Sequence, residues 1–292
     1  MDINTLFQVL TNGLLISGLY AVLTIGLTLV LGVMGIVNFA HGAFVMIGAY
    51  TTYWAFTLLG IDPFISMILS AAVLFLIGII AFRFTIGPIL NDPELNQMLL
   101  TLGILIILEN IALILWTANT KSVITFYSDK SISLGPIHFG LIRLMVFILS
   151  VVLTTALVLF LNKTRIGNSI RAVSQNRDGA WLVGVNVNRI YLVAFGISAA
   201  LAGIAGTLVS TIMYVEPAVG FRLGLKAFCI VIIGGLGNIY GTLYGSLVLG
   251  ITESLVGSYL PQGSGWAEGI SFMLIMLVLI IKPKGFGGLR RM

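Results

Sequence analysis

The chain opens with 59 residues that contain no Asp, Glu, Lys or Arg: INTLFQVLTNGLLISGLYAVLTIGLTLVLGVMGIVNFAHGAFVMIGAYTTYWAFTLLGI, residues 3–61. A helix needs about 20 apolar residues to cross the hydrocarbon core of a bilayer, so this stretch is long enough for two crossings. Over all 292 residues, 59% are hydrophobic and 9% are charged, whereas a soluble domain carries about 25% charged residues. The composition predicts an integral membrane protein and excludes a soluble enzyme, a nucleic-acid binder and a disordered chain.

Further charge-poor runs give the remaining crossings. A shorter apolar piece, residues 223–236, has about 14 residues, which is typical of a re-entrant or broken half-helix rather than a full span. We therefore predict an all-α, polytopic transmembrane helical bundle with eight or nine membrane segments, organised as a single transmembrane domain over residues 1–292. The other long segments are expected at about 64–82, 95–116, 144–162, 190–213, 239–258 and 268–281.

Basic residues predict the orientation. If the loop 163–189, the C-terminal tail and Arg83 lie in the cytoplasm, ten of the 15 Lys and Arg residues are inside and five are outside. This distribution obeys the positive-inside rule. It places the N-terminus outside and the C-terminus in the cytoplasm, which requires an odd number of crossings.

Small residues recur at helical spacing in the later segments. Gly237, Gly241 and Gly245 follow one another every four residues, and Gly203 pairs with Ala199 at the same spacing. Small residues at this spacing let helix backbones approach closely in lipid. We expect these glycines to pack helices within the bundle, and a contact with a second subunit is the alternative.

Polar residues interrupt the long charge-free stretch at Gly35-Ile-Val-Asn-Phe-Ala-His-Gly42. At such a break, Asn38, His41 and Gly42 either cap helix ends or line a path for a polar solute. A metal role for His41 is not expected, because the other histidine, His138, lies in a loop predicted to face the opposite side. No cofactor and no metal site are predicted.

Two acidic residues lie in predicted membrane segments. Glu109 is in the middle of 95–116 with no basic residue within ten positions. A carboxylate there is costly and should face the bundle interior or a water-filled cavity. It either binds a substrate ammonium or relays protons, or it forms a buried, hydrogen-bonded helix contact. Glu253 is nearer a helix end and is expected to be solvated at the membrane interface.

The loop 163–189 combines an apolar stripe with polar and basic residues. Ile166, Ile170 and Val173 are spaced by four and three residues, which predicts a short amphipathic helix pair. Such a pair either lies on anionic lipid or docks into a groove of a partner protein. The polar pair Gln175-Asn176 and the following Asp178 favour docking, because contact with lipid alone would not need them. The residues assigned to the docking surface are Arg165, Ile166, Ile170, Arg171, Gln175, Asn176 and Gly184.

The chain contains no Gly-Lys dipeptide and hence no phosphate-binding loop of the Walker type. We therefore expect that it is not an enzyme and that any ATP is bound by a partner.

Four separated blocks resemble the permeases of bacterial branched-chain amino acid ABC transporters. They lie at residues 32–50, 165–189, 226–238 and 282–287, and Asn-Phe-Ala-His-Gly42 is similar to the H-type permease subunit. The resemblance implies an importer of Leu, Ile and Val in the bacterial cytoplasmic (inner) membrane. Its other subunits would be a second homologous permease, two cytoplasmic ATPases and a periplasmic or lipid-anchored solute-binding protein.

The same resemblance implies that the loop 163–189 couples the permease to the ATPase and that Asn38 and His41 lie near the translocation path. It leaves the solute open, because related permeases serve urea, short-chain amides and other amino acids. A secondary transporter or channel that uses Glu109 as a proton or cation site is the competing class.

Overall fold

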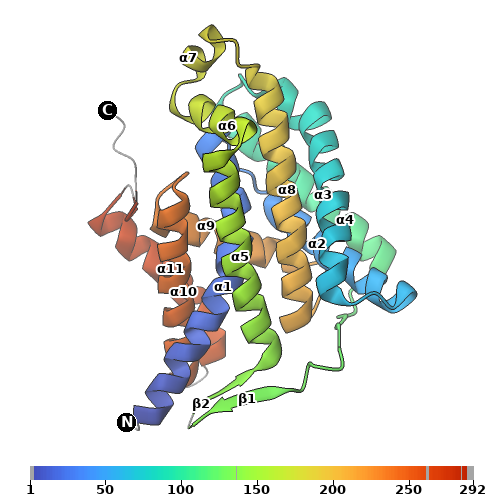
Figure 1. The fold of residues 1–292 in the computed structure, drawn as a ribbon, viewed down its shortest axis with the longest axis vertical. Helices are drawn as coiled ribbons and strands as arrows, with labels where there is room; N and C mark the ends of the chain where they lie inside the picture. Colours follow the sequence, from blue (N-terminus) through green and yellow to red (C-terminus); the bar gives the residue numbers. More distant parts are fainter. Residues whose placement is uncertain (1–2, 136, 261–262, 284, 288–292) are drawn as a thin grey trace.

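The computed structural model describes residues 3–135, 137–260, 263–283 and 285–287. It is a bundle of long helices with one two-stranded antiparallel hairpin (Figure 1). The elements in chain order are α1 (Ile3–Met34), α2 (His41–Leu59), α3 (Pro63–Ala81), the π-helical turn η1 (Phe82–Ile86), the 3-10 turn η2 (Gly87–Ile89), α4 (Glu94–Trp116), β1 (Ser131–Leu134), β2 (Ile137–Gly140), α5 (Leu141–Lys163), α6 (Arg165–Gln175), α7 (Arg177–Leu182), α8 (Val187–Ile212), α9 (Val219–Gly234), α10 (Ile239–Tyr259) and α11 (Gly263–Ile281).

Seven helical segments of the described chain are long and apolar enough to cross a membrane: α1, α2, α3 with its following turns, α4, α5, α8 and α10. Helix α11 adds a shorter apolar stretch, 269–281. Helix α9 has only 16 residues and begins at Val219, four residues before the predicted piece. The prediction of an all-α, polytopic bundle is confirmed.

The helices run between two ends of the bundle (Figure 1). At the hairpin end, the first turns of α1 lie beside β2, where the Gln8 side chain accepts a hydrogen bond of 2.7 Å from the His138 amide. At the α6–α7 end, α6 packs on α1, α5 and α8. Helix α9 leads back toward the α6–α7 end, where the Phe286 amide donates to the Ile233 carbonyl. If α9 and α11 are counted with the seven longer spans, the chain passes through the bundle nine times, and its last described residues lie at the end opposite its start.

Helix α1 is the centre of the bundle. Its most apolar stretch is 83% buried, against 17% for α4, because α5, α8, α9 and α10 all pack on it. Its hydroxyl groups are satisfied: Thr24 donates to the carbonyl of Tyr20, and Thr28 donates to that of Thr24 and lies 2.8 Å from Thr242 of α10. The outer helices expose their apolar side chains, as expected for contact with lipid.

The predicted packing glycines lie at close approaches within this chain. A Cβ atom on Gly203 would lie 2.7 Å from the carbonyl oxygen of Ser70, and one on Gly241 would lie 1.9 Å from the carbonyl oxygen of Gly234. Gly245 faces the backbone of α9 in the same way. These contacts leave no room for a second subunit at the three positions.

Gly237 differs from the pattern that grouped it with the helical series. It lies in the turn between α9 and α10, with φ +77°, and α10 begins only after Asn238 caps it. A Cβ atom on Gly237 would lie 2.7 Å from the Cα of Gly32. Gly237 is therefore a turn residue that allows this loop to pack on α1, because a left-handed backbone favours glycine.

Candidate functional site

The break between α1 and α2 lies inside the bundle, and its two polar side chains shape it. Asn38 is buried, and its side-chain oxygen accepts a hydrogen bond of 3.1 Å from the Ala40 amide. His41 is also buried, with Nε2 2.8 Å from the carbonyl oxygen of Leu23. Asn38 thus closes the turn before α2, whose N-cap residue Ala40 has no side-chain cap, and His41 holds the start of α2 against α1.

Gly42 and Glu109 meet at the start of the short helix α9. A Cβ atom on Gly42 would lie 2.1 Å from the carbonyl oxygen of Gly220. Glu109, on α4, accepts a hydrogen bond of 2.8 Å from the Phe221 amide, in the first turn of α9. The residue before α9 provides no side-chain cap. Glu109 therefore supplies the cap from another helix, and its negative charge suits the N-terminal end of a helix dipole.

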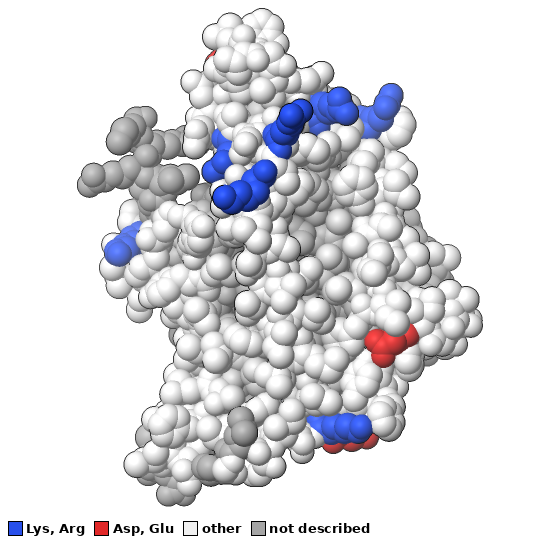
Figure 2. Space-filling view, in the orientation of Figure 1, with Lys and Arg blue, Asp and Glu red and all other residues white. Residues whose placement is uncertain are grey.

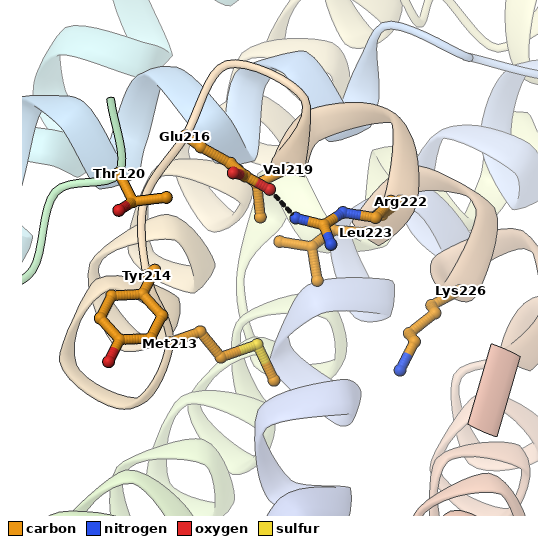
Figure 3. A pocket seen from close by; sticks show the side chains of 8 residues that line it. All are labelled: Thr120, Met213, Tyr214, Glu216, Val219, Arg222, Leu223 and Lys226. Carbon is orange, nitrogen blue, oxygen red and sulfur yellow. Dashed lines mark hydrogen bonds and ion pairs between the residues drawn. The ribbon is translucent and has the colours of Figure 1, made fainter. Parts of the chain in front are cut away.

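A cavity of about 330 Å³ lies beside α9, toward the hairpin end (Figure 3). Glu216 and Arg222 form an ion pair in its wall, with side chains that are 26% and 50% exposed. Lys226 lines the cavity one helical turn further along α9. Met213, Val219 and Leu223 provide apolar contact surface. None of these residues was assigned a role in a site from the sequence, where Arg222 and Lys226 were counted only among the cations on the outer side.

Behind the cavity, Lys226 belongs to a polar network that joins four helices. Its Nζ lies 3.0 Å from Glu253 Oε1 and 3.0 Å from the Tyr20 hydroxyl. Tyr20 also donates to Glu253, and the Ser271 hydroxyl lies 2.9 Å from the same carboxylate. The side chains of Lys226 and Glu253 are only 17% and 9% exposed. A buried ion pair of this kind persists only when its remaining hydrogen-bonding positions are filled.

The prediction that Glu253 is solvated at the interface is therefore wrong. Helix α10 continues to Tyr259, so Glu253 is not at its end, and the carboxylate turns into the bundle toward Lys226. Lys226 lies in α9, within the short apolar piece 223–236 that the sequence predicts. The sequence carried one signal for this pair: a lone cation and a lone carboxylate in two neighbouring apolar segments.

The predicted docking loop forms two short helices with clear caps. Thr164 accepts a hydrogen bond from the Gly167 amide at the start of α6, and Asn176 accepts one from the Gly179 amide at the start of α7. Gly184, with φ +87°, follows α7 and ends the pair. Of the residues assigned to the docking surface, Arg165, Ile166, Arg171, Gln175, Asn176 and Gly184 are exposed.

Ile170 is the exception and must be reassigned. Its side chain is 1% exposed, and with Val173 it lies on the face of α6 that packs on α1, α5 and α8. Two of the three residues of the apolar stripe, Ile170 and Val173, are thus covered by this chain, because an amphipathic helix at the end of a bundle buries its apolar face against the bundle.

Three adjacent apolar side chains at the end of α7 are exposed instead. Trp181, Leu182 and Val183 are 68%, 76% and 79% exposed, and α7 projects furthest from the bundle (Figure 1). Figure 2 shows Lys and Arg side chains gathered toward this end of the molecule. In the sequence, this tip is marked by a run of large apolar residues in a charged loop. The docking prediction relied instead on the helical spacing of the apolar residues in α6.

A family model described as "Branched-chain amino acid transport system / permease component" matches residues 9–279. The chain belongs to this permease family. Among its relatives, the high-affinity branched-chain amino acid transport system permease protein BraD of Pseudomonas aeruginosa is 31% identical, over 96% of this chain and 95% of the relative. The corresponding protein LivH of Escherichia coli K12 is 30% identical over the same shares.

As a member of this family, the chain is a multi-pass integral membrane protein of the transport-permease class. The resemblance inferred from the four sequence blocks is confirmed. The ribose import permease protein RbsC of Escherichia coli K12 is also similar, at 26% identity over 97% of this chain and 86% of the relative. No solved structure matches this chain.

Proposed function

We propose that this chain is the permease subunit of an ATP-binding-cassette importer and forms half of the translocation path for Leu, Ile and Val. One observation carries the proposal: the family match over residues 9–279, with relatives named for branched-chain amino acid transport that are matched over 95% of their length. The ribose permease is less similar, at 26% identity. Urea, short-chain amides and other amino acids are the alternative solutes.

In this proposal the α6–α7 end faces the cytoplasm of a bacterial cell, and the hairpin end receives a periplasmic or lipid-anchored solute-binding protein. The basic residues support this orientation, since seven of the twelve described cations lie toward the α6–α7 end and five toward the hairpin end. Cytoplasmic loops carry the excess of Lys and Arg in membrane proteins. The N-terminus is then outside and the C-terminus inside.

Two cytoplasmic ATPase subunits bind and hydrolyse ATP, and this chain needs no cofactor of its own. The exposed tip Trp181–Leu182–Val183, with the polar side chains of α6 beside it, supports a docking surface for one of them. Trp is among the residues that contribute most binding energy when they are buried at protein interfaces, and burial of the adjacent Leu and Val adds apolar area.

A second homologous permease covers the outer face of α4. Glu109 is partly exposed and Asn110 is exposed there, in the middle of an otherwise apolar helix. Polar groups at this depth are costly in lipid, so a protein surface on this face is favourable. The hydrogen bond from the Phe221 amide to Glu109 argues against the secondary-transporter reading, since it gives this carboxylate a structural partner.

The test is leucine uptake by a bacterial strain that lacks its own leucine importers and receives this permease with its partner subunits. The variant Leu182→Asp should insert normally, because α7 lies outside the membrane segments, but it should lose the ATPase. Burial of a Leu side chain is worth about 1.5–3 kcal/mol, so ATPase binding should weaken about tenfold or more.

The matched control is Ile124→Asp, which changes an exposed apolar residue (68%) of the loop before the hairpin. It should retain the ATPase. Normal co-purification and uptake with Leu182→Asp would refute the docking surface. A wild-type complex that assembles and takes up another solute but no branched-chain amino acid would refute the proposed solute.

A further inference from the structure

The cavity beside α9 is lined by charged side chains of both signs, which differ in how they are paired. Arg222 and Glu216 are partly exposed and bind each other. Lys226, one turn further along, is already neutralised by Glu253 and held by Tyr20. The inner pair, Lys226–Glu253, needs no further partner. The outer pair, Arg222–Glu216, is accessible to water, and each of its members can bind a solute in place of the other.

The charge balance selects the kind of solute. With Lys226 neutralised, the exchangeable groups are one guanidinium and one carboxylate. A lone anion at Arg222 would displace Glu216 and leave that carboxylate beside it without a partner. A solute that carries one carboxylate and one ammonium gives each group of the pair a new partner of opposite sign. Arg also binds carboxylates through two parallel hydrogen bonds, which favours this exchange.

Part of the remaining wall, which also includes Thr120 and Tyr214, matches an aliphatic side chain. Met213, Val219 and Leu223 supply apolar surface next to the ion pair (Figure 3). The volume of about 330 Å³ lies at the small end of the usual range for small-molecule pockets, ~300–1,000 Å³.

We propose that this cavity is a recognition site for a free, zwitterionic α-amino acid. Arg222 binds the substrate carboxylate, Glu216 binds its ammonium group, and the apolar wall contacts its side chain. The proposal rests on the proposed function, because it assumes an amino acid as solute, and it adds a site within the permease itself. Lys226 lines the site, remains paired with Glu253 behind it and does not exchange partners.

The experiment measures uptake of radiolabelled L-leucine and ATP hydrolysis by the complete importer in proteoliposomes with its solute-binding protein. Arg222→Gln and Glu216→Gln should each lower the kcat/KM of uptake at least tenfold, while the complex assembles and the loaded binding protein still stimulates ATP hydrolysis. The control Arg143→Gln changes an exposed arginine at the same end of the bundle, outside the cavity, and should transport normally.

The double variant Arg222→Gln/Glu216→Gln separates recognition from a structural ion pair. A merely structural pair leaves an unpaired charge in each single variant, so the double variant would regain uptake; that result overturns the proposal. If the pair binds substrate, the double variant transports no better than either single variant. Loss of stimulated ATP hydrolysis together with uptake would instead assign these residues to the binding-protein contact and also overturn the proposal. A wild-type importer without leucine uptake contradicts the proposed function, whereas normal uptake by all variants contradicts only the cavity site.

Discussion

Helix α9 carries two ion pairs one turn apart, and their surroundings differ sharply. The outer pair, Arg222–Glu216, has side chains that are 50% and 26% exposed. The inner pair, Lys226–Glu253, has exposures of 17% and 9% and two additional hydroxyl partners. The same chemistry therefore has two consequences: water screens the outer pair and weakens its contribution to stability, whereas the inner pair is costly to break.

The largest effect is expected when one partner of the inner pair is removed. Lys226→Met leaves the Glu253 carboxylate buried without its cation, which costs about 3–5 kcal/mol. The variant should be recovered in low yield and should unfold at a clearly lower temperature in detergent. The double variant Lys226→Met/Glu253→Gln should recover most of the loss, because no uncompensated charge remains. A stable Lys226→Met protein would show that the pair is not buried as described.

A smaller loss is expected from the hydroxyl that joins the two members of the inner pair. Tyr20→Phe removes the hydrogen bonds to Lys226 and Glu253 but keeps the ion pair and the ring. A hydrogen bond to a charged group contributes about 1.5–3 kcal/mol. The thermal unfolding midpoint of the purified permease should fall accordingly, and that of Tyr240→Phe, which changes an exposed tyrosine (68%), should not. Equal midpoints for the two variants would mean that the hydroxyl contributes nothing to the network.

The smallest effect on stability is expected at the outer pair. Arg222→Gln should change the unfolding free energy by about 0–1 kcal/mol, as for other exposed ion pairs, although it should reduce leucine uptake strongly. Thermal unfolding and uptake measured on the same preparation test this separation. A stability loss as large as that of Lys226→Met would remove the distinction between the two pairs.

The sequence predicted the helices well because membrane segments are defined by length and by the absence of charge. It predicted α9 as a broken helix from its short apolar piece but placed its start too late. Arg222 fell just before the predicted piece and Lys226 inside it, and both were counted only among the cations on the outer side. The burial of Lys226 depends on its partner Glu253, which lies 27 positions away in the sequence. Spacing along one helix does not reveal such a contact.

The docking loop shows the same limit at the surface. The spacing of Ile166, Ile170 and Val173 predicts a helix with an apolar face, but it does not predict which surface covers that face. The structure shows that this chain buries Ile170 and Val173 itself and leaves the end of α7 exposed. Similarly, the break at Asn38 and His41 was predictable, whereas their bonding partners, Ala40 and Leu23, are known only from the folded bundle.

The central position of α1 has a consequence for biogenesis. Synthesis proceeds from the N-terminus, so α1 is made first, although every helix that encloses it is made later. Thr24 and Thr28 donate hydrogen bonds to carbonyl oxygens of α1 itself. Their hydroxyl groups are therefore satisfied while α1 lies in lipid before the other helices are made. The Tyr20 hydroxyl, in contrast, meets Glu253 only after 233 further residues have been added. The first helix to be made is therefore fully enclosed only at the end of synthesis, and a nascent chain that stops before α10 leaves the α10-facing side of α1 uncovered.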